Sequence, residues 1–256
     1  MARLTDLIRE QATQKDGNPD VIGLPNPPST PSPSVVETDW YQRAGHAIQG
    51  IKQAVQAGQS WKLDELTRIA AGVVASLGAN DRLVHAVLQR NGKDYLINNA
   101  VNVAIVSVEI AEILRYDSAK LEQVALAGFL HDIGMFALPD TLVYKTGSLT
   151  EGELQFLREH PQHGARLFKE LGTAHPAVGR AILQEHERWD GSGYPNRLTG
   201  DQIDEMAFVV GLADVFDALM GPRPYRRGMS PHRAICTLIA NGKTMFPHHI
   251  LKALID

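Results

Sequence analysis

Apolar residues recur at three- and four-residue steps over most of the chain beyond its first forty positions, the spacing of an amphipathic helix. The clearest examples run from Asp39 to Ala57 and from Leu63 to Leu77. The stretch from Val101 to Leu114 is apolar nearly all round, so we expect it to lie in the core. Two-residue alternation is absent over any useful length. The pattern therefore predicts an all-α fold, a helical bundle around one core with an N-terminal helical extension.

Helix boundaries can be predicted at two places. The apolar run LEQVALAGFL ends in His131 and Asp132, and Gly134 is expected to stop that helix. In SLTEGELQFLREH, Thr150 precedes Glu153 by three residues. This capping-box spacing predicts that a helix begins there and continues through the segment.

The composition changes once along the chain. The stretch GNPDVIGLPNPPSTPSPS is dense in Pro, Gly and Ser, too poor in apolar residues to pack and too rich in proline for a helix. We predict an N-terminal segment over 1–16, a flexible tether over 17–36, an N-terminal helical region over 37–90 and the main helical domain over 91–256.

Charge and composition narrow the function. A net charge of -4 argues against general DNA or RNA binding, which needs a basic surface. No run approaches the roughly 18 consecutive apolar residues of a membrane span. The single cysteine, Cys236, excludes an internal disulfide framework, and the first residues lack the apolar core of a signal peptide. We therefore expect a cytoplasmic protein.

Histidine and carboxylate residues fall at positions that four predicted helices turn inward. Each has an ordinary alternative on its own, as an ion-pair partner or a hydrogen-bonded core histidine. Together they form a ligand set for Fe, Mn, Zn or Co, and such an ion activates water for attack on phosphorus. The candidates are His131 and Asp132 after the apolar run, His160 on the face that carries Phe156 and Leu157, Glu185 and His186 on the stripe of Val178, Ile182 and Trp189, and Asp214 with Asp217 three residues later.

Three motifs in register, HDIG, HERWDGSGYP and LADVFDALMGPRPYR, resemble the HD-GYP branch of the HD metal-dependent phosphohydrolases. The resemblance implies an HD-domain helical bundle with two or three metal ions, often iron or manganese. It also implies hydrolysis of the bacterial second messenger cyclic di-GMP to the linear dinucleotide pGpG or to GMP. We take two divalent ions as the expected cofactors. The ligands that it implies are His131, Asp132, His160, His186 and Asp214, with Asp132 bridging two ions and His131 and Asp132 as the catalytic pair.

The resemblance also implies substrate contacts. Arg223 and Arg226 match positions that meet phosphate, and a guanidinium can donate two parallel hydrogen bonds to that group. Tyr194 is expected on the guanine side, and Asp217 is the fourth predicted substrate-binding residue. Asp190, which precedes a glycine in the same loop, is expected to bond within its own turn.

The sequence departs from the family pattern at three positions. Asn99 stands where a first ligand histidine is expected, Glu185 replaces the first histidine of a pair, and Met135 replaces a lysine. An amide binds transition metals less well than imidazole, whereas glutamate can ligate iron or manganese. Two functions therefore stay open: a working cyclic di-GMP phosphodiesterase, which the remaining ligand positions favour, and a catalytically inactive signalling or nucleotide-sensing module. The second would have diguanylate cyclase (GGDEF-type) domains as possible partners.

Overall fold

The computed structural model describes residues 35–77, 94–172, 175–221 and 228–255, and every regular element in these ranges is helical. This confirms the predicted fold class. In chain order the helices are α2 (Val35–Gln56), α3 (Asp64–Leu77), α5 (Tyr95–Ile113), α6 (Ser118–Leu130), η1 (Ile133–Ala137), α7 (Asp140–Val143), α8 (Glu151–Leu157), α9 (His160–Glu170), α10 (Pro176–Gln184), η2 (Gly200–Gln202), α11 (Glu205–Met220), α12 (Pro231–Asn241), η3 (Gly242–Thr244) and α13 (His248–Ile255).

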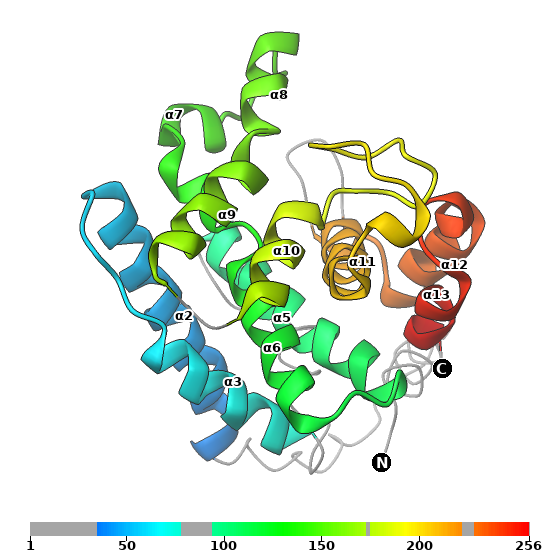
Figure 1. Ribbon diagram of the computed structural model, residues 1–256, viewed down its shortest axis with the longest axis horizontal. Helices are drawn as coiled ribbons and strands as arrows, with labels where there is room; N and C mark the ends of the chain where they lie inside the picture. Colours follow the sequence, from blue (N-terminus) through cyan, green and yellow to red (C-terminus); the bar gives the residue numbers. More distant parts are fainter. Residues whose placement is uncertain (1–34, 78–93, 173–174, 222–227, 256) are drawn as a thin grey trace, which may run out of the picture.

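Helix α5 forms the centre of the molecule. Its N-cap Asp94 accepts the backbone N–H of Leu96, and buried residues follow along almost its whole length, as the all-round apolar pattern predicts. Helices α6, α11 and α2 pack around it (Figure 1). By length and composition, α5 is the one described helix able to cross a membrane, but 78% of that stretch is buried inside the protein. The burial is that of a core helix.

The N-terminal helices α2 and α3 lie side by side on one flank, and α12 and α13 lie on the opposite flank (Figure 1). Ile48 and Leu66 of the N-terminal pair belong to the same hydrophobic core as the central helices. Lys52 of α2 also pairs with Asp94 at 2.8 Å. The predicted N-terminal segment lies outside the described residues, as does most of the predicted tether, whose last two residues begin α2.

The chain leaves α6 at Leu130 and turns directly into η1, but Gly134 does not end the helix in the way we predicted. It lies inside η1 and has no positive φ. A Cβ atom there would lie 1.9 Å from the carbonyl oxygen of His160 and 2.6 Å from the nitrogen of Gly164. The glycine is required because the backbones of η1 and α9 approach too closely for any side chain.

The predicted helix through SLTEGELQFLREH is two helices. The capping box is present, because Thr150 accepts from the N–H of Glu153 and the Glu153 carboxylate accepts from the N–H of Thr150. Helix α8 ends at Leu157, and α9 begins at His160 with Pro161 in its first turn. Proline fits a first turn but cannot continue a helix. His160 therefore does not share a buried face with Phe156, which is 41% exposed.

Candidate metal centre

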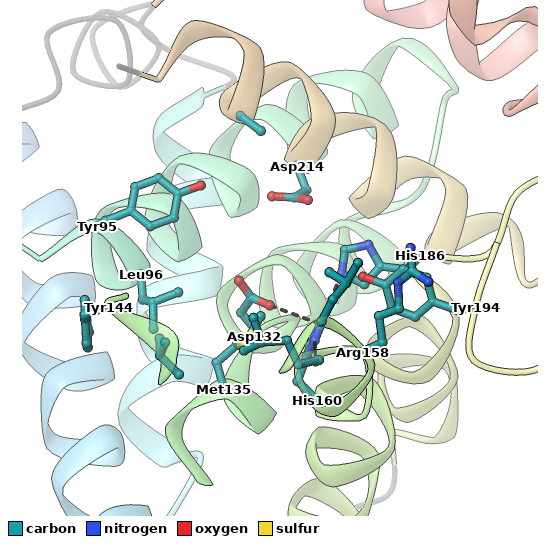
Figure 2. Close-up of a pocket in the computed structure, with 14 residues that line it drawn as sticks. Tyr95, Leu96, Asp132, Met135, Tyr144, Arg158, His160, His186, Tyr194 and Asp214 are labelled. Carbon is teal, nitrogen blue, oxygen red and sulfur yellow. Dashed lines mark hydrogen bonds and ion pairs between the residues drawn. The ribbon is translucent and has the colours of Figure 1, made fainter. Parts of the chain in front are cut away.

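Four segments deliver the predicted ligands to one place. His131 caps the C-terminal end of α6 and Asp132 follows it, His160 is the first residue of α9, and Glu185 caps the end of α10. With His186 and with Asp214 of α11, these residues form two overlapping groups. Figure 2 shows the four of them that line a cavity, Asp132, His160, His186 and Asp214. One group holds Asp132, His160, Glu185 and His186, the other holds His131, Glu185 and Asp214, and within each the ligand atoms lie within 4.8 Å of one another.

The carboxylates of Asp132 and Glu185 lie between the histidines. The Nε2 atom of His131 is 3.5 Å from Asp132 Oδ2 and 4.0 Å from Glu185 Oε2. The Nε2 atom of His160 is 3.3 Å from Asp132 Oδ1 and 3.7 Å from Glu185 Oε1. Both carboxylates thus present one oxygen to each imidazole. Glu185 belongs to both groups, whereas Asp132, for which the resemblance implies a bridging role, belongs to the first group only.

Backbone carbonyl groups fix the orientation of two histidine rings. His131 Nδ1 is 2.8 Å from the carbonyl oxygen of Gly128, and His160 Nδ1 is 2.8 Å from that of Leu157. A carbonyl oxygen only accepts, so Nδ1 carries the proton and donates it. In the neutral ring this leaves the lone pair on Nε2, which faces the carboxylates. A histidine that ligates a metal is commonly held in this way.

The donors of the centre are buried, and several lack hydrogen-bond partners. His131, His160 and Glu185 are each 1% exposed. In the described part of the chain, His131 Nε2 and both oxygens of Glu185 have no hydrogen-bond partner. Buried polar atoms of this kind are costly unless a counter-charge or a metal completes them. Imidazole nitrogen with carboxylate oxygen is a donor set that a divalent transition metal fits.

The pKa values of these groups reflect the crowding of charge. Burial alone would lower the pKa of His131, but the carboxylates of Glu185, Asp132 and Asp214 outweigh it and raise this pKa to about 9. Burial raises the pKa of Glu185, against the opposing effect of the histidines. Burial and the neighbouring His160 and Arg188 hold the pKa of His186 well below its usual value. His186 is therefore a neutral imidazole at pH 7 and needs to lose no proton to bind a metal.

A cavity of about 410 Å³ opens onto the centre (Figure 2). Ligand residues form its polar part, and aromatic and aliphatic side chains form the rest. Its lining consists of Tyr95, Leu96, Asp132, Met135, Val143, Tyr144, Leu154, Leu157, Arg158, His160, His186, Tyr194, Asp214 and Ala218. Pockets of roughly 300–1,000 Å³ with this mixture are typical of small-molecule sites.

Tyr194 lines the cavity and packs against His186, a predicted ligand. Its ring stacks on His186 with centroids 4.6 Å apart and an interplanar angle of 21°. The buried carboxylate of Glu187 holds the following loop by accepting the N–H groups of Asn196 at 2.7 Å and Leu198 at 3.0 Å. Asp190 accepts the N–H of Ser192 at 3.0 Å, which confirms the turn predicted for it.

The other predicted substrate residues are placed differently. Asp217 is 1% exposed, does not line the cavity and accepts hydrogen bonds from Asn99 and Asn102. This buried position away from the cavity lining does not fit the direct substrate contact that we predicted for Asp217. The sequence showed only that Asp217 shares a helix face with Asp214. Arg223 and Arg226 lie outside the described residues.

Sequence reasoning missed Arg158. It is exposed between α8 and α9 and is the lining residue, among those described, with a permanent positive charge. Its guanidinium carbon lies 5.4 Å from the centre of the Tyr194 ring. The sequence predicts one continuous helix through this segment, and on such a helix Arg158 cannot be distinguished from an ordinary solvent-exposed arginine. Only the break in the helix turns it toward the cavity.

Comparison with known proteins places these observations in a family context. The HD domain pattern matches residues 82–248. Cyclic di-GMP phosphodiesterase PA4108 of Pseudomonas aeruginosa is 31% identical over 81% of this chain and 52% of its own length. The cyclic di-GMP phosphodiesterase response regulator RpfG of Xanthomonas campestris pv. campestris is 37% identical over 57% of this chain and 39% of its own length. 3'3'-cGAMP-specific phosphodiesterase 2 of Vibrio cholerae is 30% identical over 60% of this chain and 30% of its own length. The chain spans about half the length of these relatives or less.

A solved structure has a similar fold. Bd1817, an HDG"Y"P protein from Bdellovibrio bacteriovorus, matches with a TM-score of 0.71 over 89% of this chain and 74% of that chain. The sequences are 19% identical, so the likeness concerns the fold alone. It agrees with the helical bundle predicted from the motifs.

Proposed function

Because the chain belongs to the HD domain family and is related to the HD-GYP cyclic di-GMP phosphodiesterases, we propose that it hydrolyses a phosphodiester bond of a cyclic dinucleotide. Cyclic di-GMP is the proposed substrate, and pGpG or GMP the product. The observation that carries the proposal is the buried cluster around Glu185. The oxygens of Glu185 lack hydrogen-bond partners among the described residues, and its neighbours Asp132, His160 and His186 line the cavity. A structural core has no use for such a cluster without a cation.

The residues that would hold two divalent ions are those of the two overlapping groups. Asp132, His160, Glu185 and His186 would hold one ion, and His131, Glu185 and Asp214 the other. When bound, iron or manganese supplies Lewis acidity and activates water for hydrolysis. The backbone carbonyls that fix His131 and His160 keep the Nε2 atoms directed inward, so the ligands need little rearrangement.

The cavity wall is suited to the rest of the substrate. Arg158 can pair with a phosphate, and its guanidinium group lies near the Tyr194 ring. Tyr194, Tyr95 and Tyr144 supply aromatic surfaces to which a purine base can bind by stacking. Relatives named for cyclic di-GMP and for 3'3'-cGAMP are both similar to this chain, so both dinucleotides belong in the first assay.

The deciding experiment combines metal content with turnover. Anaerobically purified protein is analysed by elemental mass spectrometry and then incubated with cyclic di-GMP or 3'3'-cGAMP and added Fe²⁺ or Mn²⁺. We expect up to two ions per chain and a linear product. Absence of cleavage of either dinucleotide at saturating Fe²⁺ and Mn²⁺ would contradict the proposal.

A second candidate function is a catalytically inactive signalling or sensing module. The observation that favours it is the orientation of Asn99, which turns its amide nitrogen toward Asp214 and leaves three donors in that group. In this case dinucleotide or metal would bind without turnover, and GGDEF-type domains are the proposed partners. Binding measured by calorimetry together with absent cleavage would support this alternative.

A further inference from the structure

A buried chain of hydrogen bonds joins helix α2 to the candidate metal centre. The hydroxyl of Tyr41 donates to Asn102 Oδ1 at 2.8 Å, and Asn102 Nδ2 donates to Asp217 Oδ1 at 2.9 Å. Asn99 Nδ2 donates both to Asp217 Oδ2 at 3.0 Å and to Asp214 Oδ1 at 3.1 Å. The chain of bonds thus crosses from α2 through α5 to α11 and ends on an oxygen of a predicted ligand.

The direction of this chain is fixed by its chemistry. Carboxylate oxygens accept, so the amide nitrogens of Asn99 and Asn102 must face Asp217. The carbonyl oxygen of Asn102 is then left to accept from Tyr41. Asn99 uses its two amide hydrogens on two carboxylates, and neither asparagine can flip without placing an oxygen against an oxygen.

Three residues of the network are buried in the core. Asn99, Asn102 and Asp217 are each 1% exposed, and each would be costly there without its partners. Apolar residues of similar size can join two core helices at no greater cost. Joining the helices therefore does not explain the network, whereas its contact with the Asp214 carboxylate at its end does. Asp214 Oδ1, which accepts from Asn99, also lies 3.8 Å from His131 Nε2.

We propose that Tyr41, Asn102, Asp217 and Asn99 are positioning residues that hold the Asp214 carboxylate toward His131 and so set the affinity of this group for a divalent cation. The inference rests on the metal centre of the proposed function. Outer partners of a ligand fix its orientation, and their loss commonly weakens metal binding. Tyr41 lies on α2, which precedes the family match over residues 82–248, so in this proposal a helix outside the match supports the centre.

The test is to remove the Tyr41 hydroxyl, which lies at the opposite end of the network from Asp214. Tyr41→Phe is compared with Tyr116→Phe in the full chain, each stripped of metal with chelator. Tyr116 is a matched control, because its hydroxyl also donates to a side chain of α11, Glu205, at the end of that helix remote from Asp214. Mn²⁺ binding is measured by titration calorimetry without nucleotide, and thermal unfolding of the metal-free proteins is measured alongside.

We expect Tyr41→Phe to weaken Mn²⁺ binding at one site by about tenfold and Tyr116→Phe to leave it unchanged. Equal Mn²⁺ affinity in wild type and Tyr41→Phe overturns the inference, as does an equal loss in both variants. A lower melting temperature without weaker Mn²⁺ binding shows a purely structural role and also overturns it. Wild-type protein that binds no Mn²⁺ overturns it together with the metal centre. Mn²⁺ binding without dinucleotide cleavage overturns only the proposed reaction.

Discussion

Single residues determine whether the centre can hold a cation, and Glu185 is the clearest case. Helical spacing from Val178 and Ile182 correctly predicts that Glu185 is buried. The same spacing is wrong for Trp189, which is 39% exposed because α10 has ended at Gln184. Periodicity holds only as far as the helix continues, and helix ends are the least certain part of a sequence-based prediction.

Asp132 is the predicted ligand whose removal best separates metal binding from folding. Its carboxylate is partly exposed at the cavity and contacts His131 and His160, so Asp132→Ala leaves no large hole in the core. We expect loss of bound metal and of turnover with an unchanged helical circular dichroism spectrum. Asp201→Ala, an exposed carboxylate on η2, is the control and should keep both. Turnover retained in Asp132→Ala would refute the assigned site.

Arg158 allows a prediction about substrate binding. Replacing a cation that pairs with phosphate costs about 1.5–3 kcal/mol, so Arg158→Gln should raise KM for the cyclic dinucleotide roughly tenfold or more, with a smaller change in kcat. Steady-state kinetics at two salt concentrations measures this, and the effect should shrink at high salt. Arg166→Gln, an exposed arginine on α9, is the control. An equal KM increase in both variants would indicate a general charge effect.

The sequence identified the residues that cluster at the candidate centre more reliably than it identified their surroundings. His131, Asp132, Glu185 and His186 fall in quoted motifs or on a predicted helix face, and the structure brings them together. The roles of Asp217 and Arg158 depend on contacts with residues distant in the chain or on a break in a helix. No local pattern encodes such contacts.

At the scale of helices, the approach of η1 to α9 places His160. The sequence correctly predicts α5, because a long apolar run leaves few alternatives. It does not predict that the segment around His160 divides into α8 and α9. The apolar residues Leu154 and Phe156 have the spacing of a buried helix face, although both are exposed. The proline at 161 is the local signal for the boundary.

Gly134 gives this approach a direct test. The side chain of Gly134→Ala would collide with the backbone of α9 at His160 and Gly164, so the variant should lose about 1–3 kcal/mol of unfolding free energy or more and bind Mn²⁺ more weakly. Urea unfolding and calorimetry measure the two effects. Gly152→Ala, in α8 with nothing within 4 Å of the added Cβ, should be neutral or slightly stabilising. A Gly134→Ala protein as stable as wild type would mean that η1 and α9 separate easily.

At the scale of the whole molecule, folding and metal binding are coupled through protons. The centre concentrates Asp132, Glu185 and Asp214 around His131 in the core. Without metal, a proton on His131 partly balances these carboxylates, because its pKa is raised to about 9. A raised folded-state pKa stabilises the fold below the ordinary histidine pKa of about 6.5, and this contribution is lost as pH rises through about 9.

Metal binding should therefore release protons. At pH 7.5 an ion entering the group of His131 must displace the proton on Nε2, so Mn²⁺ affinity should rise as the pH increases from about 6.5 to about 9. Calorimetry in buffers of different ionisation enthalpy counts the protons released, and we expect at least one for each ion bound at this group. The same titration above pH 9 is the internal control, because His131 has by then lost its proton and the release should fall. A heat of binding independent of the buffer at pH 7.5 would show that the ion binds without displacing a proton, and therefore not at His131.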